Sequence, residues 1–185
     1  MMNIFVLDND PVIAAQLQCD KHVVKMIVES AQMLSTAHRI LDGFVEKRPS
    51  KSGKRMINYW VHPNDNLESV LYKAVHHKHP STVWTMESNN NYNWHYVHFC
   101  ALCDEYEYRY GKKHSTDLLL RELLATPPHK IPIGYKTKQP LAMKSNPECM
   151  FPDVVKSYRA FYQTKQKRFN MVWTNREIPE WFEVI

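Results

Sequence analysis

The most restrictive feature of this sequence is a helical pattern over residues 20–41 that is apolar around most of its circumference. At 100° per residue, its polar side chains gather in one narrow seam, about 80° wide. An exposed helix would carry a wider polar face, so the pattern predicts a mostly buried helix whose seam lines a cleft. The alternative is a solvated stripe with ordinary ion pairs. The seam contains His22, Lys25, Glu29, Gln32 and Thr36, and Lys21 and Arg39 extend it.

Two charged side chains of the seam are placed to act together. Lys25 and Glu29 are four residues apart, which brings them to the same face of the helix as an ion pair. A carboxylate in a partly apolar cleft can act as a general acid or base, and a nearby Lys or His can hold a phosphate. We therefore interpret the seam as the candidate site.

The rest of the chain predicts a mainly α, single compact helical domain over residues 1–185, with a short extended arm at residues 3–7. Asp10 and Pro11 are expected to open the first helix, which has a kink near Cys19 where Asp20 can cap a new start. Gly43 is expected as a cap beyond Leu41. Further helices are expected at residues 66–77, 89–110, 117–125 and 153–167, with a loop at 46–58, a short turn at 81–84 and a Pro-rich irregular segment at 126–152.

Composition narrows the class of protein. The chain has 185 residues, is 44% hydrophobic and carries a formal net charge of +5, which is compatible with a nucleic-acid partner. The first ten residues lack the features of a signal peptide, and no apolar stretch is long enough for a bilayer. We expect a cytoplasmic protein with reduced thiols and no membrane contact.

A cluster of cations occupies the loop expected at residues 46–58. In a flexible loop such side chains are typical of an element that contacts the DNA backbone without reading its sequence. The alternative is a solvated surface loop. The cations are Lys47, Arg48, Lys51, Lys54 and Arg55.

Three short motifs resemble the phage-type pyrimidine-dimer DNA glycosylase superfamily (small endonuclease V type), which includes uncharacterised phage and bacterial relatives. Residues 20–34, with Lys25, Glu29 and Gln32, resemble the first active-site helix of that family. Residues 79–84, HPSTVW, resemble its His-Pro-small-x-x-Trp motif. Residues 105–111, EYEYRYG, resemble the end of its aromatic helix. The resemblance covers about residues 8–114.

The resemblance implies an α-helical DNA glycosylase or lyase that acts on a damaged or modified pyrimidine in duplex DNA, in the host cytoplasm if the protein is phage-encoded. Glu29 would be the catalytic carboxylate, assisted by Lys25 and His22, while Lys21, His22 and Lys25 would grip phosphates. The family's nucleophile is the N-terminal amine. Here the chain begins Met1-Met2, a start that is not normally trimmed, so the identity of the nucleophile stays open. The other residues carried into the substrate site are Gln32, Arg39, His79 and Trp84.

Further polar residues have two interpretations each. His76, His77 and His79 could form a metal or phosphate site, or simply mark a helix end. The Asn-rich stretch at residues 89–95, including Asn93, could read and stack on bases, or its aromatic residues could be core. Arg109 could reach a phosphate or pair with Glu105.

Cys100 and Cys103 form a CxxC that could bind zinc together with Cys19 and His22. Because the pair lies within a helix on an apolar stripe, we expect buried free thiols instead, with no metal and no cofactor. Two alternatives to the glycosylase hypothesis stay open: a phage-type DNA-base or nucleotide modification enzyme that uses group transfer on this scaffold, and a noncatalytic DNA-binding accessory protein. The oligomeric state is not predicted.

Overall fold

The computed structural model describes residues 2–185, so the expectation about an N-terminal amine at Met1 lies outside the described residues. Helices dominate this part of the chain, as predicted, and the β-structure is one two-stranded antiparallel sheet. The elements are α1 (Pro11–Gln16), α2 (Asp20–Leu41), β1 (Phe44–Pro49), β2 (Met56–Val61), α3 (Asp65–Val70), α4 (Pro80–Glu87), α5 (Asn89–Tyr110), α6 (Ser115–Leu124), the 3₁₀ turn η1 (Pro147–Cys149), α7 (Val154–Gln163) and the 3₁₀ turn η2 (Thr164–Lys167).

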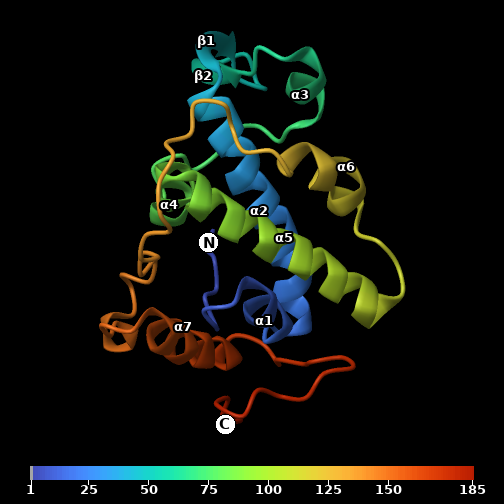
Figure 1. Cartoon of the computed structure of the whole chain (residues 1–185), viewed down its shortest axis with the longest axis vertical. Coiled ribbons are helices and arrows are strands. Elements are labelled where there is room, and N and C mark those ends of the chain that lie inside the picture. Colours follow the sequence, from blue (N-terminus) through green and yellow to red (C-terminus); the bar gives the residue numbers. More distant parts are fainter. Residues whose placement is uncertain (1) are drawn as a thin grey trace.

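The two long helices α2 and α5 cross at the centre of the molecule (Figure 1). The β1–β2 hairpin and α3 lie at the C-terminal end of α2, whereas α7 and the C-terminal tail lie at the opposite end (Figure 1). The apolar faces of α2 contribute Val23, Ile27 and Leu34 to the core, each fully buried. This confirms the prediction that α2 is largely buried. The arm at residues 3–7 is also buried, but it forms no strand.

Several helix ends follow local sequence signals. The Asp10 side chain accepts hydrogen bonds from the backbone N–H groups of Val12 and Ile13, with Pro11 at the first helical position. The chain then breaks between α1 and α2, where a kink was expected. α5 ends at Gly111, whose φ of 66° lies in the left-handed region that glycine adopts without strain.

Other helix ends differ from the expectation. Cys19, not Asp20, is the N-cap of α2, because Asp20 is the first helical residue and its carboxylate binds Arg109 and Thr174. Gly43 does not cap α2, since Asp42 is the C-cap. A Cβ at Gly43 would instead collide with the carbonyl oxygens of Arg39 and Val61, so glycine lets the hairpin approach the end of α2. α6, expected to begin at residue 117, begins at Ser115 with His114 as its N-cap.

The expected loop at residues 46–58 is wrong, because this region forms the β1–β2 hairpin. The strands pair with Phe44 opposite Val61 and Pro49 opposite Met56, and the turn contains Gly53 at a φ of 70°. Much of both strands is exposed, so neither shows the alternation of apolar and polar residues that normally identifies a half-buried strand.

Two helical segments differ in length from the prediction. The helix expected at residues 66–77 is the shorter α3, and residues 71–79 are irregular, with His76 at a φ of 48°. The turn expected at 81–84 is the eight-residue α4. The helices expected at 89–110, 117–125 and 153–167 are confirmed as α5, α6 and α7 with η2, and residues 126–152 are irregular apart from η1. No helix within residues 2–185 is both long and apolar enough to cross a bilayer.

Candidate functional site

A partly enclosed cavity of about 140 Å³ lies between the N-terminal half of α2 and the segment that follows α7. We call it the Lys165 pocket. Two residues of the α2 seam, His22 and Lys25, contribute to its wall, so the prediction that the seam lines a cleft holds for this part of the seam only. The lining residues are Asn3, Phe5, His22, Lys25, Met26, Phe161, Lys165, Arg168 and Phe169.

Glu29 lies beside this pocket and is held by two lining residues. The backbone N–H of Asn3 donates to Glu29 Oε2 over 3.1 Å, and Lys25 Nζ lies 3.3 Å from Glu29 Oε1. The expected ion pair between Lys25 and Glu29 is therefore confirmed. Glu29 is only 8% exposed, whereas Lys25 extends toward solvent. The N-terminal arm thus fixes the carboxylate in a partly buried position.

Lys165 is the least expected member of the pocket. Its side chain is buried, with 7% of the residue exposed, and its Nζ lies 3.4 Å from the centre of the Phe161 ring. Within residues 2–185 its ammonium has neither a carboxylate partner nor a hydrogen-bond acceptor. Burial, together with the neighbouring Arg168 and Lys25, lowers the pKa of Lys165 to about 8. A largely buried lysine whose ammonium lines a pocket without a counter-ion favours an anionic ligand, since partial burial of an unpaired charge is costly.

His22 is buried on the same wall and is fixed by Tyr162. The Tyr162 hydroxyl accepts a hydrogen bond from Cys19 N, so its own proton is directed to His22 Nδ1, 2.8 Å away. His22 then carries its proton on Nε2. Burial, followed by repulsion from Lys165 and the other nearby lysines, lowers the pKa of His22 to about 3. His22 is therefore neutral at pH 7 and can donate a hydrogen bond, but it adds no charge to a phosphate grip.

The charge balance around the pocket is positive. Lys25, Lys165 and Arg168 line it, and Lys21 lies over the Phe169 ring at its edge, 4.4 Å from the ring centre. Glu29 is the carboxylate in contact with this group. The cavity is smaller than the roughly 300–1,000 Å³ typical of sites that enclose a drug-sized ligand. The size and charge of the pocket therefore suit a small anionic group such as a phosphate.

Sequence reasoning missed Lys165 and Arg168, because residues 115–185 showed no motif. The available signal was the basic run from Lys165 to Arg168 at the end of an amphipathic helix. That run alone gives no indication that it faces α2, about 140 positions earlier in the chain.

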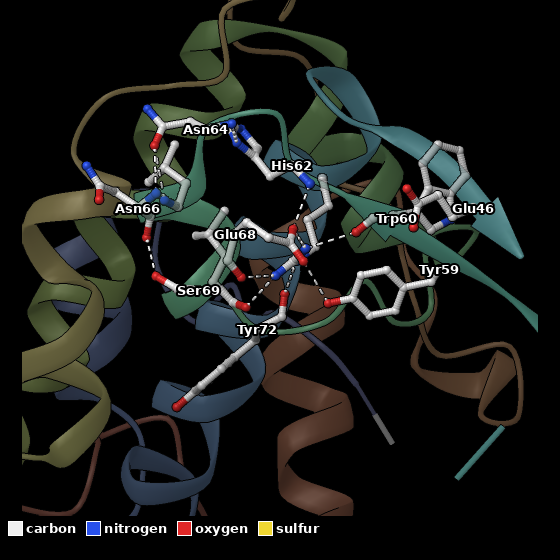
Figure 2. A network of polar contacts seen from close by, with 12 residues as sticks. Glu46, Tyr59, Trp60, His62, Asn64, Asn66, Glu68, Ser69 and Tyr72 are labelled. Carbon is white, nitrogen blue, oxygen red and sulfur yellow. Dashed lines mark hydrogen bonds and ion pairs between the residues drawn. The ribbon is translucent and has the colours of Figure 1, made fainter. Parts of the chain in front are cut away.

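Arg39, although it belongs to the seam by helical spacing, lies outside the pocket and stabilises the hairpin. Its guanidinium donates to the carbonyl oxygens of Tyr72, Trp60, Glu68 and Leu71 and to the Glu68 carboxylate. Glu68 also accepts from the Tyr59 hydroxyl and from the backbone N–H of His62. Figure 2 shows these partners converging from β2, α3 and the segment after it. The contacts of Arg39 are structural.

Arg109 of α5 is also engaged in structural contacts, at the N-terminal end of α2. It is buried and binds Glu105 Oε1, Asp20 Oδ1 and the carbonyl oxygen of Gln16. Arg176 of the C-terminal tail pairs with the same Glu105 carboxylate. These contacts bear out the predicted Glu105–Arg109 pair. Because its donors are engaged within the protein, Arg109 is not part of the pocket.

The remaining substrate-site residues predicted from the sequence are dispersed. His79 is the N-cap of α4 and accepts from Ser81 N, and Trp84 is buried with its indole N–H donating to the carbonyl oxygen of Thr137. Asn93 is exposed on α5, and Gln32 is half-buried on α2. Within the Asn-rich stretch, the side-chain amide of Asn91 makes two hydrogen bonds to Thr137. Its Nδ2 donates to Thr137 Oγ1, and its Oδ1 accepts from the backbone N–H of Thr137, so Asn91 anchors the Pro-rich segment.

The cations of residues 47–55 lie on the β1–β2 hairpin. Arg48 pairs with Glu46 and stacks over the Tyr59 ring, 3.9 Å from its centre. Lys51, Lys54 and Arg55 are exposed around the turn. The hairpin lies at the end of α2 opposite the Lys165 pocket (Figure 1). The two basic regions are therefore separate.

The cysteines do not assemble into a metal site. All four are free thiols, and burial raises the pKa of Cys103. The one group of three metal-ligating side chains found within the described residues contains no cysteine and lies at the C-terminal end of α2. The expectation of free thiols in the core is confirmed for Cys19, Cys103 and Cys149, whereas Cys100 is half-buried.

Comparisons of the chain with family models, with curated proteins and with solved structures gave no match. Function is therefore argued from the geometry of the site and from the motifs of the sequence.

Proposed function

We propose that this protein is a DNA-acting enzyme that cleaves the glycosidic bond of a damaged or modified pyrimidine, with the Lys165 pocket as its site. The observation that carries this proposal is the largely buried side chain of Lys165, which lines the pocket without an anionic partner in residues 2–185, beside the buried carboxylate of Glu29. A phosphate of the substrate would supply the missing negative charge.

The roles follow from the charges. Lys25, Lys165 and Arg168 hold the phosphate, and His22 donates a hydrogen bond from Nε2. Glu29 faces the sugar, where positive charge develops as the glycosidic bond breaks. In the hydrolytic form of the reaction, water attacks C1′ and passes a proton to Glu29. The base leaves with the bonding electron pair and is then protonated.

The size of the pocket places a condition on the substrate. A cavity of about 140 Å³ cannot admit a nucleotide that remains stacked in a duplex. The enzyme must therefore bend the DNA or extrude the target nucleotide, as other enzymes that act on bases do.

The hairpin provides a second contact to the same DNA. From Lys25 to the end of α2 at Leu41 the helix rises by about 24 Å, at 1.5 Å per residue. At 3.4 Å per base pair this corresponds to roughly seven base pairs. A duplex that lies along α2 with one phosphate in the pocket would thus reach Lys51, Lys54 and Arg55 about seven base pairs away.

The direct test uses duplexes that carry a pyrimidine dimer, a modified pyrimidine or no lesion. Release of the base, or strand cleavage at the lesion, supports the proposal. Binding without turnover on any of them would favour a noncatalytic DNA-binding protein, and transfer of a group onto the base would favour a modification enzyme. Borohydride treatment followed by intact-mass measurement reports whether an amine of the protein becomes linked to the sugar.

The pH dependence of DNA binding should show whether the protonated Lys165 side chain contributes to affinity. Because its pKa of about 8 lies well below the ordinary value, Lys165 loses its proton as the pH rises from 7 to 9. An anion binds the protonated form, so we expect affinity to fall through this range by up to about tenfold per pH unit above the pKa. Fluorescence anisotropy with a lesion-bearing duplex measures this fall.

Two variants separate this effect from general charge loss. Lys165→Met should bind weakly at pH 7 and lose most of the pH dependence between 7 and 9. Lys165→Arg keeps a charge that does not titrate, so its affinity should be nearly constant over the same range. An unchanged pH profile in both variants would remove Lys165 from the phosphate contact.

The hairpin cations should set part of the salt dependence. Each neutralised phosphate contributes a slope of about −0.9 in log K against log salt. Replacement of Lys51, Lys54 and Arg55 by Ala should flatten the slope by up to about 2.7. The matched control replaces Lys112 and Lys113, exposed lysines after α5, and should leave the slope unchanged. Equal slopes for the wild type and the hairpin variant would show that the hairpin does not contact DNA.

A further inference from the structure

A second cluster of chemistry-bearing side chains lies at the C-terminal end of α2, away from the Lys165 pocket. His38 and Asp42 are one helical turn apart, and His62 follows the last residue of β2. One ligand atom from each of the three residues lies within 4.8 Å of the other two. It is the group of three metal-ligating side chains mentioned above, and residues 2–185 contain no other such group.

Both histidines have a buried ring nitrogen that lacks a partner. His38 Nδ1 and His62 Nε2 make no hydrogen bond within the described part of the chain. The residues are only 3% and 5% exposed, so bulk water does not satisfy these atoms. Buried polar atoms are nearly always paired, and two unpaired nitrogens beside one carboxylate indicate a ligand.

The hydrogen bonds around His38 fix its tautomer. The Tyr92 hydroxyl donates its proton to the carbonyl oxygen of Leu124 over 2.9 Å, so it accepts from His38 Nε2–H, also at 2.9 Å. Nδ1 is therefore unprotonated and its lone pair is free. Burial lowers the pKa of His38 to about 4, which keeps the ring neutral at pH 7. This is the arrangement of a metal-ligating histidine whose other nitrogen is held by an outer partner.

The carboxylate of Asp42 is oriented by the Pro-rich segment. Its two oxygens accept from the backbone N–H groups of His129 and Lys130, at 2.8 and 2.9 Å. A cavity of about 280 Å³ adjoins the cluster and is lined by Asp42, His62 and His129 among others. It gives an ion access from solvent and places the exposed His129 side chain on the rim.

We propose that His38 Nδ1, His62 Nε2 and the Asp42 carboxylate bind a divalent transition-metal ion, with zinc the best match, and that His129 or water completes the coordination. Two imidazoles and one carboxylate suit zinc and its neighbours in the first transition row. His62 Nε2 and Asp42 Oδ2 are 4.0 Å apart. Tetrahedral bonds of 2.0–2.1 Å place ligand atoms about 3.4 Å apart, so modest side-chain rotation closes the site.

Metal binding has one local cost. His62 Nδ1 accepts a hydrogen bond from the backbone N–H of Asn64 over 3.1 Å, and it must carry a proton once Nε2 binds the ion. The backbone N–H of Asn64 would then donate a hydrogen bond to water instead, which is feasible because Asn64 is exposed. The loss of one hydrogen bond at the surface is small beside the free energy of a structural zinc site.

The bound ion would fasten three segments together: the end of α2, the exit of the hairpin and the start of the Pro-rich segment. It differs from the zinc site considered for Cys100 and Cys103, and it departs from the sequence-based expectation of no metal. It is independent of the proposed glycosidase chemistry.

The test uses the full chain, stripped with a chelator and then titrated with Co²⁺ and Zn²⁺. We expect one equivalent to bind, visible ligand-field absorption from a tetrahedral Co²⁺ site, and a higher Tm with Zn²⁺. Replacement of one ligand by His62→Gln or Asp42→Asn should weaken Zn²⁺ binding by more than about 100-fold. His77→Gln changes an exposed histidine outside the cluster and should bind as the wild type does.

Far-UV circular dichroism checks that each variant folds, and two variants at different ligands guard against a local folding defect. Zn²⁺ bound equally tightly by the wild type, His62→Gln and Asp42→Asn would overturn the proposal. Failure of the folded wild type to bind either ion at micromolar concentration would also overturn it.

Discussion

Glu29→Gln is expected to reduce turnover by at least about 100-fold while the protein stays folded, because general acid–base catalysis contributes roughly 10²–10⁴ in rate. Glutamine keeps the shape of the side chain and an oxygen that accepts from Asn3 N. It removes the negative charge and the ability to take up a proton. The measurement is the single-turnover rate on a duplex that carries the lesion found to be cleaved.

The expected stability cost of this change is small. The ion pair that it breaks involves Lys25, whose side chain is 49% exposed, and such pairs contribute about 0–1 kcal/mol. Glu107→Gln, on the exposed face of α5, is the matched control and should keep the wild-type rate. A Glu29→Gln variant that turns over at the wild-type rate would exclude Glu29 from the mechanism, whatever its effect on Tm.

Arg39→Met should lower the free energy of unfolding by about 3–5 kcal/mol, the cost of leaving one partner of a buried ion pair without the other. Methionine fills part of the volume but donates no hydrogen bond. Four carbonyl oxygens and the Glu68 carboxylate would lose their donor. Urea unfolding, followed by circular dichroism, measures the change in the midpoint.

Arg48→Met is the control for Arg39→Met. Arg48 also pairs with a glutamate, Glu46 of β1, but both side chains of that pair are more than 40% exposed, so the loss should be below about 1 kcal/mol. Similar midpoints for Arg39→Met and the wild type would show that the Arg39 network adds nothing to stability.

Local sequence signals predicted much of the helical part of the fold. Asp10 and Pro11 opened α1, Gly111 closed α5, and the apolar circumference of residues 20–41 indicated a buried helix. The hairpin was not predicted because it is a small, largely exposed sheet whose strands lack alternation. Gly43 was misread as a helix cap, since a close approach between the hairpin and α2 leaves no trace in the sequence around it.

For the candidate site, the sequence by itself determined the pairing of Lys25 with Glu29, because residues four apart on a helix must share a face. Helical spacing could not separate Arg39 from that pair, although Arg39 contacts the hairpin and the pair faces the pocket. The tertiary structure alone brought Lys165 to Lys25, and His62 to His38 and Asp42. Contacts of this kind depend on how distant segments pack together, and that packing is decided by burial over the whole chain rather than by the order of neighbouring residues.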